Sequence, residues 1–90
     1  MVQVNFTSHL EVFFPKIKSQ TIEAKNLTDL LKKLNQIYPG ITGYLLEDNG
    51  SIRKHVNVFL DGIALINKDD LSVSLENINE VFIMQALSGG

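Results

Sequence analysis

The chain ends, at residues 79–90, in the stretch NEVFIMQALSGG. Residues 81–87 are apolar at both odd and even positions, which predicts a strand with two apolar faces in the middle of a sheet. Ser88 joins this strand to a glycine pair, Gly89-Gly90. Chain ends usually carry polar residues, whereas glycine has no Cβ and can enter a channel that is too narrow for other residues. The stretch therefore predicts a core strand that leads directly into a thin tail.

We expect a single domain over residues 1–87 and a flexible tail over residues 88–90. The group expected to act is the α-carboxylate of Gly90. A free α-carboxylate is ionised at neutral pH and is then a poor electrophile, but ATP can convert it to an acyl-adenylate that a sulfur or amine nucleophile attacks. The alternative is that the glycine pair is a remnant of an expression tag or of a truncated linker.

The first half of the chain predicts two strands and one helix. Residues 1–7 alternate apolar and polar side chains, and residues 19–25 predict a second strand paired antiparallel with the first. Asn26 is a good helix N-cap, and Pro39-Gly40 ends the helix. Side chains at spacings of three and four form one apolar stripe between these limits, and they are Leu27, Leu30, Leu31, Leu34, Ile37 and Tyr38.

The second half predicts three more strands. Residues 40–53 are expected to be irregular. Residues 55–60 alternate as a strand, Asp61-Gly62 forms a hairpin turn, residues 63–66 return as a short strand, and residues 79–87 form the last one. Because one amphipathic helix needs a sheet to lie on, this order predicts an α+β fold of the β-grasp type. Its mixed sheet has four to five strands, with the first and last strands side by side and one main helix on one face.

One helix covers only one face of such a sheet. Phe82 and Met84 are then left on the other face as an apolar patch that needs a partner. The alternative is that a loop, 8–14 or 40–53, covers these two side chains.

Composition and charge limit the function classes. The chain has no cysteine, which excludes disulfides, thiolate metal sites and cysteine nucleophiles within it. Its net charge of −2 argues against nucleic acid as the main partner. No apolar segment approaches the ~18 residues of a membrane span, and no signal peptide is evident, so we expect a cytoplasmic protein. The acidic residues of the second half are either solvated or form a face near the tail that meets a basic partner.

Catalytic and metal-binding patterns are absent from the sequence. His9 and His55 lack the spacing of a metal-ligand pair, and no glycine loop is arranged to bind phosphate. No serine lies in a nucleophile elbow, and Asp69-Asp70 is typical of a solvated turn. We therefore expect a protein with no catalytic residues, metal or bound cofactor of its own, on which other enzymes act.

The chain resembles the MoaD/ThiS family of ubiquitin-like sulfur carriers and is most similar to its MoaD branch. The resemblance spans nearly the whole chain and is carried by residues 2–6, 27–34, 38–39, 55–62 and 80–90. Its most specific part is a Val-Asn-Val strand with an Asp-Gly turn, placed before an apolar strand that closes in Ser-Gly-Gly. The resemblance implies the β-grasp fold, in agreement with the pattern of strands and helix.

The resemblance also implies a reaction and its partners. Gly90 would be adenylated by a MoeB/ThiF-type activating enzyme that uses MgATP, and then be thiocarboxylated. Ser88, Gly89 and Gly90 would insert into the active site of a partner. In the MoaD branch that partner is the MoaE-like large subunit of molybdopterin synthase, and the sulfur builds the dithiolene of molybdopterin.

Apolar residues on the open sheet face dock both partners in the MoaD branch. This implies partner contacts for Met84 and Leu60, in addition to Phe82 of the apolar patch. The chain departs from many relatives at Gln85, where they have proline. The segment 40–53 is longer than the matching segment of the shortest ThiS-like members, which favours a MoaD-like protein.

Three functions stay open from the sequence. The first is a sulfur carrier for molybdopterin, with thiamin, cysteine or tRNA as other destinations of the sulfur. The second is a ubiquitin-like modifier joined to lysines through Gly90, because some MoaD-like proteins, notably archaeal ones, act in this way. The third is a plain interaction domain in which the glycine pair is incidental.

Overall fold

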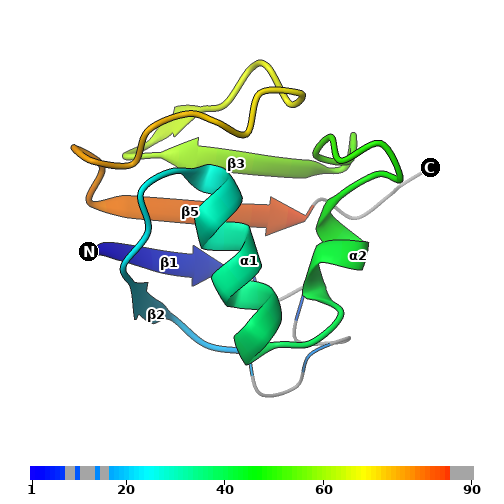
Figure 1. Cartoon of the computed structure of the whole chain (residues 1–90), viewed down its shortest axis with the longest axis horizontal. Coiled ribbons are helices and arrows are strands. Elements are labelled where there is room, and N and C mark those ends of the chain that lie inside the picture. Colours follow the sequence, from blue (N-terminus) through cyan, green and yellow to red (C-terminus); the bar gives the residue numbers. More distant parts are fainter. Residues whose placement is uncertain (8–9, 11–13, 15–16, 86–90) are drawn as a thin grey trace.

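A mixed sheet forms the centre of the structure, a computed structural model that describes residues 1–7, 10, 14 and 17–85. Its strands are β1 (Val2–Phe6), β2 (Gln20–Ile22), β3 (Val56–Leu60), β4 (Ile63–Ala64) and β5 (Glu80–Gln85). The order across the sheet is β2-β1-β5-β3-β4, as Figure 1 shows. β1 and β5 are parallel, and the other neighbours are antiparallel. The predicted β-grasp, with the first and last strands adjacent in the middle, is confirmed.

Helix α1 (Leu27–Ile37) crosses one face of this sheet (Figure 1). The Asn26 side chain caps it by accepting a hydrogen bond of 2.8 Å from the backbone N–H of Asp29, so the predicted start is confirmed. The leucine stripe is buried. Ile37, which the spacing placed in the same stripe, is 45% exposed because it lies in the last turn of the helix, at the margin of the sheet.

The core fills the space between α1 and the sheet. Each long strand contributes alternate side chains to it, because neighbouring residues of a strand point to opposite faces. These side chains are Val2, Val4, Val56, Val58, Val81 and Ile83, all buried. From the helix, Leu27, Leu30, Leu31 and Leu34 pack against them.

A second helix, α2 (Ile41–Leu45), interrupts the segment that was expected to be irregular over residues 40–53. That expectation is wrong for these five residues. Ile41 and Leu45 lie four positions apart and are both buried in the core. One helical turn with a glycine in its middle has weak propensity and no periodic pattern long enough to see in a sequence.

The β3–β4 hairpin turns at Asp61-Gly62, as predicted. Both residues have positive φ, 51° and 85°, which is the conformation of a type I′ turn. The Asp61 carboxylate also accepts hydrogen bonds from the backbone N–H groups of Asn79, at 3.1 Å, and Glu80, at 2.8 Å. The turn is thereby tied to the first residue of β5.

No helix in the described part of the chain has the length and apolar character needed to cross a membrane.

Candidate functional site

Strand β5 delivers the chain to the expected tail. β5 ends at Gln85, and the predicted tail residues Ser88, Gly89 and Gly90 lie outside the described residues. Gln85 pairs with Val56 of β3, and its backbone N–H donates a hydrogen bond of 3.3 Å to the Thr7 hydroxyl that follows β1. The point from which the tail continues is therefore held by both neighbouring strands.

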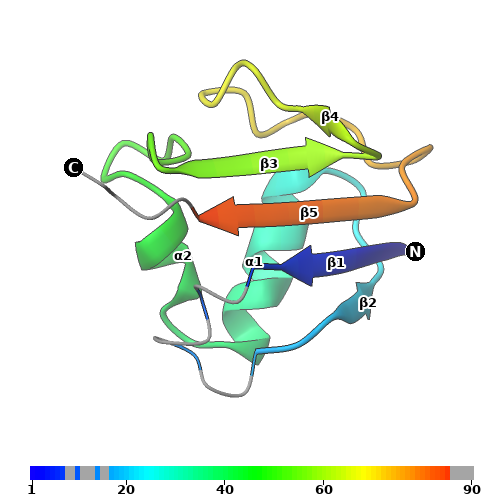
Figure 2. The same cartoon turned by 180° about the vertical axis from the view of Figure 1, so that it is seen from behind.

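The side of the sheet away from α1 carries a second set of β5 side chains. Phe82 is the cross-strand partner of Asn5 and Phe59, and Met84 is the partner of Asn57. Directly paired residues point to the same side of a sheet, so these side chains share the face seen in Figure 2, with α1 behind it. We call this surface the open face, and it comprises the half-buried residues Asn5, Asn57, Phe59, Glu80, Phe82 and Met84.

The open face has an apolar and a polar part. The Phe59 and Phe82 rings meet edge to face, with centroids 6.4 Å apart, and Met84 lies one position before the end of β5. On the β1 side, the Asn5 amide donates to the Glu80 carboxylate at 2.5 Å. The apolar part, Phe59, Phe82 and Met84, therefore leads along β5 towards the point where the tail continues.

Leu60 does not share this surface. It pairs with Val81, whose side chain is buried under α1, and it packs against the core. Because side chains alternate along β3, Phe59 occupies the open face instead. The resemblance grouped Leu60 with Phe82 and Met84 as partner contacts, and the structure separates them onto opposite faces.

The described apolar residues of the two loops that were candidates to cover Phe82 and Met84 pack on the helix side. Leu10 is fully buried in the core, and Phe14 stacks edge to face with Tyr38 and Tyr44, at centroid distances of 6.5 and 5.3 Å. Ile41 and Leu45 belong to the same core. The described apolar side chains of these loops therefore do not cover the open face.

Among the described acidic side chains, two lie away from the end of β5 and others have partners in their own loops. Asp61 and Glu80 lie at the opposite end of that strand, and Glu47 forms an ion pair of 2.9 Å with Arg53. The Ser72 hydroxyl and backbone N–H lower the pKa of Asp70 by hydrogen bonding to its carboxylate. These contacts fit the solvated, turn-forming alternative better than an acidic docking face.

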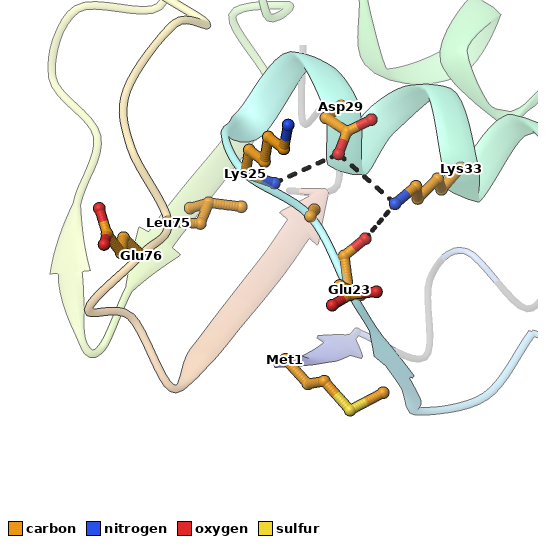
Figure 3. Close-up of a pocket in the computed structure, with 8 residues that line it drawn as sticks. Met1, Glu23, Lys25, Asp29, Lys33, Leu75 and Glu76 are labelled. Atoms are coloured by element: carbon orange, nitrogen blue, oxygen red, sulfur yellow. Dashed lines mark hydrogen bonds and ion pairs between the residues drawn. The ribbon is translucent and has the colours of Figure 1, made fainter.

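A hollow of about 680 Å³ lies near Met1 (Figure 3). It is at the end of the sheet where β1 and β5, which run parallel, both start, opposite the end of β5. Lys33, which lines it, contacts the Glu23 carbonyl and forms an ion pair of 3.5 Å with Asp29, one turn earlier in α1. The backbone N–H of Lys25 and the charge of Lys33 lower the pKa of Asp29. These contacts hold the β2–α1 connection against the helix. They do not place a nucleophile next to a general base, as a catalytic site would need.

Metal binding finds no support in the described residues, since none of their histidine, aspartate and glutamate side chains form a group of three that could hold an ion. His55 is exposed just before β3, and His9 lies outside the described residues.

Sequence comparison detects a curated relative of this chain. It is 32% identical over 62 residues, 69% of this chain and 66% of the relative, to the small archaeal modifier protein 3 of Haloferax volcanii. The chain thus spans about two thirds of that relative's length. No protein-family model matches the chain.

Solved structures share the whole fold. A chain of the Amycolatopsis orientalis BexX/CysO complex superposes with a TM-score of 0.82 at 17% identity, covering 100% of both chains. CysO of Mycobacterium tuberculosis gives a TM-score of 0.81 at 20% identity, over 97% of this chain and 100% of that one. SAMP1 of Haloferax volcanii gives 0.73 at 19% identity, over 99% and 98% of the two chains. These structures show that the chain has their β-grasp fold, and with the sequence relative they place it in the MoaD/ThiS-like family of ubiquitin-like proteins.

Proposed function

We propose that this chain is a sulfur carrier that works through the carboxylate of Gly90. One observation carries the proposal. The apolar part of the open face, Phe59, Phe82 and Met84, lies beside the end of the central strand β5, from which the sequence continues into Ser-Gly-Gly. A partner that docks on this face is positioned to receive the residues that follow.

The chemistry proceeds in two steps. The Gly90 carboxylate oxygen attacks the α-phosphorus of ATP on a MoeB/ThiF-type activating enzyme, which forms an acyl-adenylate and releases pyrophosphate. A sulfur nucleophile then attacks the carbonyl carbon, AMP leaves, and the product is a thiocarboxylate. This chain supplies no catalytic side chain to either step. Its sheet fixes the end of β5, from which the sequence continues to the glycines. Because glycine has no Cβ, these residues fit a narrow channel.

The acceptor of the sulfur is the finer part of the proposal. In the MoaD-like case, the tail inserts into a MoaE-like large subunit and the sulfur enters molybdopterin. Thiamin, cysteine and tRNA are other acceptors of the same class of reaction. The chain's similarity to a relative named as a modifier protein favours a second function equally, in which the amine of a target lysine attacks the carbonyl carbon of the adenylated Gly90, AMP leaves and an isopeptide bond forms.

The test is intact mass spectrometry of the full chain after incubation with the activating enzyme, MgATP and a sulfur source. We expect replacement of one oxygen by sulfur at Gly90, lost when Gly90 is deleted. Gly89→Val, which adds a side chain to the tail without touching β5, should fold normally and remain unmodified. Ser88→Ala is the matched control, and it should be modified like the original chain.

The two functions give different products in this test. A mass gain confined to the free chain supports the carrier, whereas conjugates to target lysines that vanish on deletion of Gly90 support the modifier. The proposal requires that Gly90 carry a free carboxylate. Absence of both products from a chain that the activating enzyme binds would overturn it.

A further inference from the structure

The two edges of the sheet differ in chemical character. At the β2 edge the neighbouring side chains are charged and exposed, namely Lys18, Glu23 and Lys25, which is a common protection against pairing with another chain. At the β4 edge they are apolar. Ile63 is 75% exposed, Ile66 is 92% exposed, and Ala64 between them is also exposed. The β4 edge lacks the charged protection that the β2 edge has.

The backbone of Ala64 faces outward from this edge. Leu60 and Ile63 flank a two-residue turn and form the first pair of the hairpin, and the N–H of Leu65 donates to the carbonyl of Val58 at 2.7 Å. Hydrogen-bonded and non-bonded pairs alternate in an antiparallel ladder. Ala64 therefore belongs to a non-bonded pair, and its N–H and C=O point away from β3, ready to pair with a further strand.

The edge is continuous with the apolar part of the open face. Ala64 is the cross-strand partner of Phe59, which is in turn the partner of Phe82. A row of apolar side chains thus crosses the sheet from β5 to its β4 edge. A partner that contacts Phe82 and Phe59 can therefore extend to Ala64 over apolar side chains alone.

Two charged groups close to the hairpin in sequence, Asp61 and Lys68, have hydrogen-bond partners. The Asp61 carboxylate accepts from Asn79 and Glu80, and the Lys68 ammonium donates to the carbonyls of Arg53, at 3.4 Å, and Lys54, at 3.1 Å. An occupant of the edge is therefore recognised by backbone pairing and apolar contact rather than by charge.

A second copy of the chain is a poor occupant. β4 has two residues, and together with Ile66 it offers far less than the roughly 800 Å² per partner that a stable interface buries. The same strip is well suited to extend a larger interface. Resting on the proposed function, we propose that the partner that docks on the open face also adds an extended apolar strand to the β4 edge, paired with Ala64 and covering Ile66, while Ile63, the partner of Leu60, meets the added strand from the helix side.

The probe is the activating enzyme, with affinity measured by titration calorimetry against the full chain. Ala64→Pro removes the outward N–H but no hydrogen bond to β3, and proline is tolerated at edge strands. Ile66→Asp places a charge in the strip. We expect each to weaken binding by about tenfold or more, comparable to the loss of an ordinary interface contact. Ile37→Asp, which charges an exposed isoleucine on the helix side, is the control and should bind like the original chain.

Hydrogen exchange supplies a second, independent readout on the unaltered chain. The amide of Ala64 should exchange freely in the isolated protein and become protected in the complex, because strand addition pairs it. Unchanged exchange at Ala64 together with normal binding of Ala64→Pro would overturn the inference. So would concentration-dependent dimerisation that Ile66→Asp abolishes, since a second copy would then cover the edge.

The outcomes separate the two proposals. If the original chain is adenylated by the enzyme and both edge variants bind normally, the edge inference fails and the carrier function stands. If the enzyme neither binds nor adenylates the original chain, both fail.

Discussion

The two faces of strand β5 carry the same kind of side chain in different surroundings. Val81 and Ile83 are 0% exposed and lie against α1, whereas Phe82 and Met84, one position away, are half-buried on the open face. Both sets are large and apolar, so hydrophobicity alone does not distinguish fold from function in this strand. The position of one helix decides which set stabilises the domain and which is available to a partner.

The largest expected effect is on the covered face. Ile83→Ala leaves a cavity between β5 and α1 and should lower the free energy of unfolding by about 2–5 kcal/mol. Met84→Ala removes a side chain of similar size from the open face and should cost less than about 1 kcal/mol. Urea unfolding followed by circular dichroism measures both. Equal losses for the two variants would remove the distinction between the faces.

The open face should show the reverse behaviour in binding. Met84→Asp puts a charge in the apolar part next to the end of β5, and we expect affinity for the activating enzyme to fall by about tenfold to a hundredfold, or about 1.4–2.8 kcal/mol. Gln36→Asp, at an exposed position of α1 on the helix side, is the control. The thermal midpoint of each variant should stay close to that of the original chain, and a large drop for Met84→Asp would show that the residue is structural.

The helix that creates the difference depends on its cap. Asn26→Ala removes the acceptor of the Asp29 backbone N–H and should destabilise the domain by about 1 kcal/mol. Asn77→Ala, at an exposed turn position, is the control and should change stability by less than about 0.5 kcal/mol. The comparison is again made by urea unfolding, and equal stability of the two variants would contradict the role of the cap.

The smallest expected effect is a dependence on pH near the start of α1. The pKa of Asp29 is lowered below its ordinary value of 3.8 by the Lys25 N–H and by Lys33. A carboxyl with a lowered folded-state pKa stabilises the fold above the ordinary pKa and loses this contribution as the pH falls through the folded-state pKa. NMR titration of the Asp29 carboxyl should show this. In Asp29→Asn, the acid loss of stability should be slightly smaller, while Asp48→Asn, in an exposed turn, should leave it unchanged.

Much of the fold was predictable because its signals are local. Alternation located β1, β3 and β5, the Asn26 cap and leucine spacing located α1, and Asp61-Gly62 located the hairpin. α2 was missed because one turn of helix is too short to show a repeating pattern of apolar residues. The extent of the hydrogen-bonded strands was also overestimated, since β2 covers Gln20–Ile22 rather than residues 19–25.

The part of the candidate site that follows from the alternation of side chains along a strand was predictable. Phe82 and Met84 fall on the open face as expected, and the same alternation puts Leu60 under the helix and Phe59 beside Phe82. The resemblance selected Leu60 by its approximate position, and a shift of one residue in a strand exchanges the faces. The roles of Ser88, Gly89 and Gly90, which lie outside the described residues, stay predictions.

The hydrogen bond between Gln85 and Thr7 joins residues 78 positions apart. The strand at the centre of the sheet is therefore the last of the five described strands along the chain, and β1 gains this neighbour only after β5 has been made. A nascent chain that stops short of β5 has no sheet centre and no open face. Under the proposed function, an enzyme that docks on the open face would therefore bind only chains that contain the segment leading into the glycines, and we expect it not to bind truncated products.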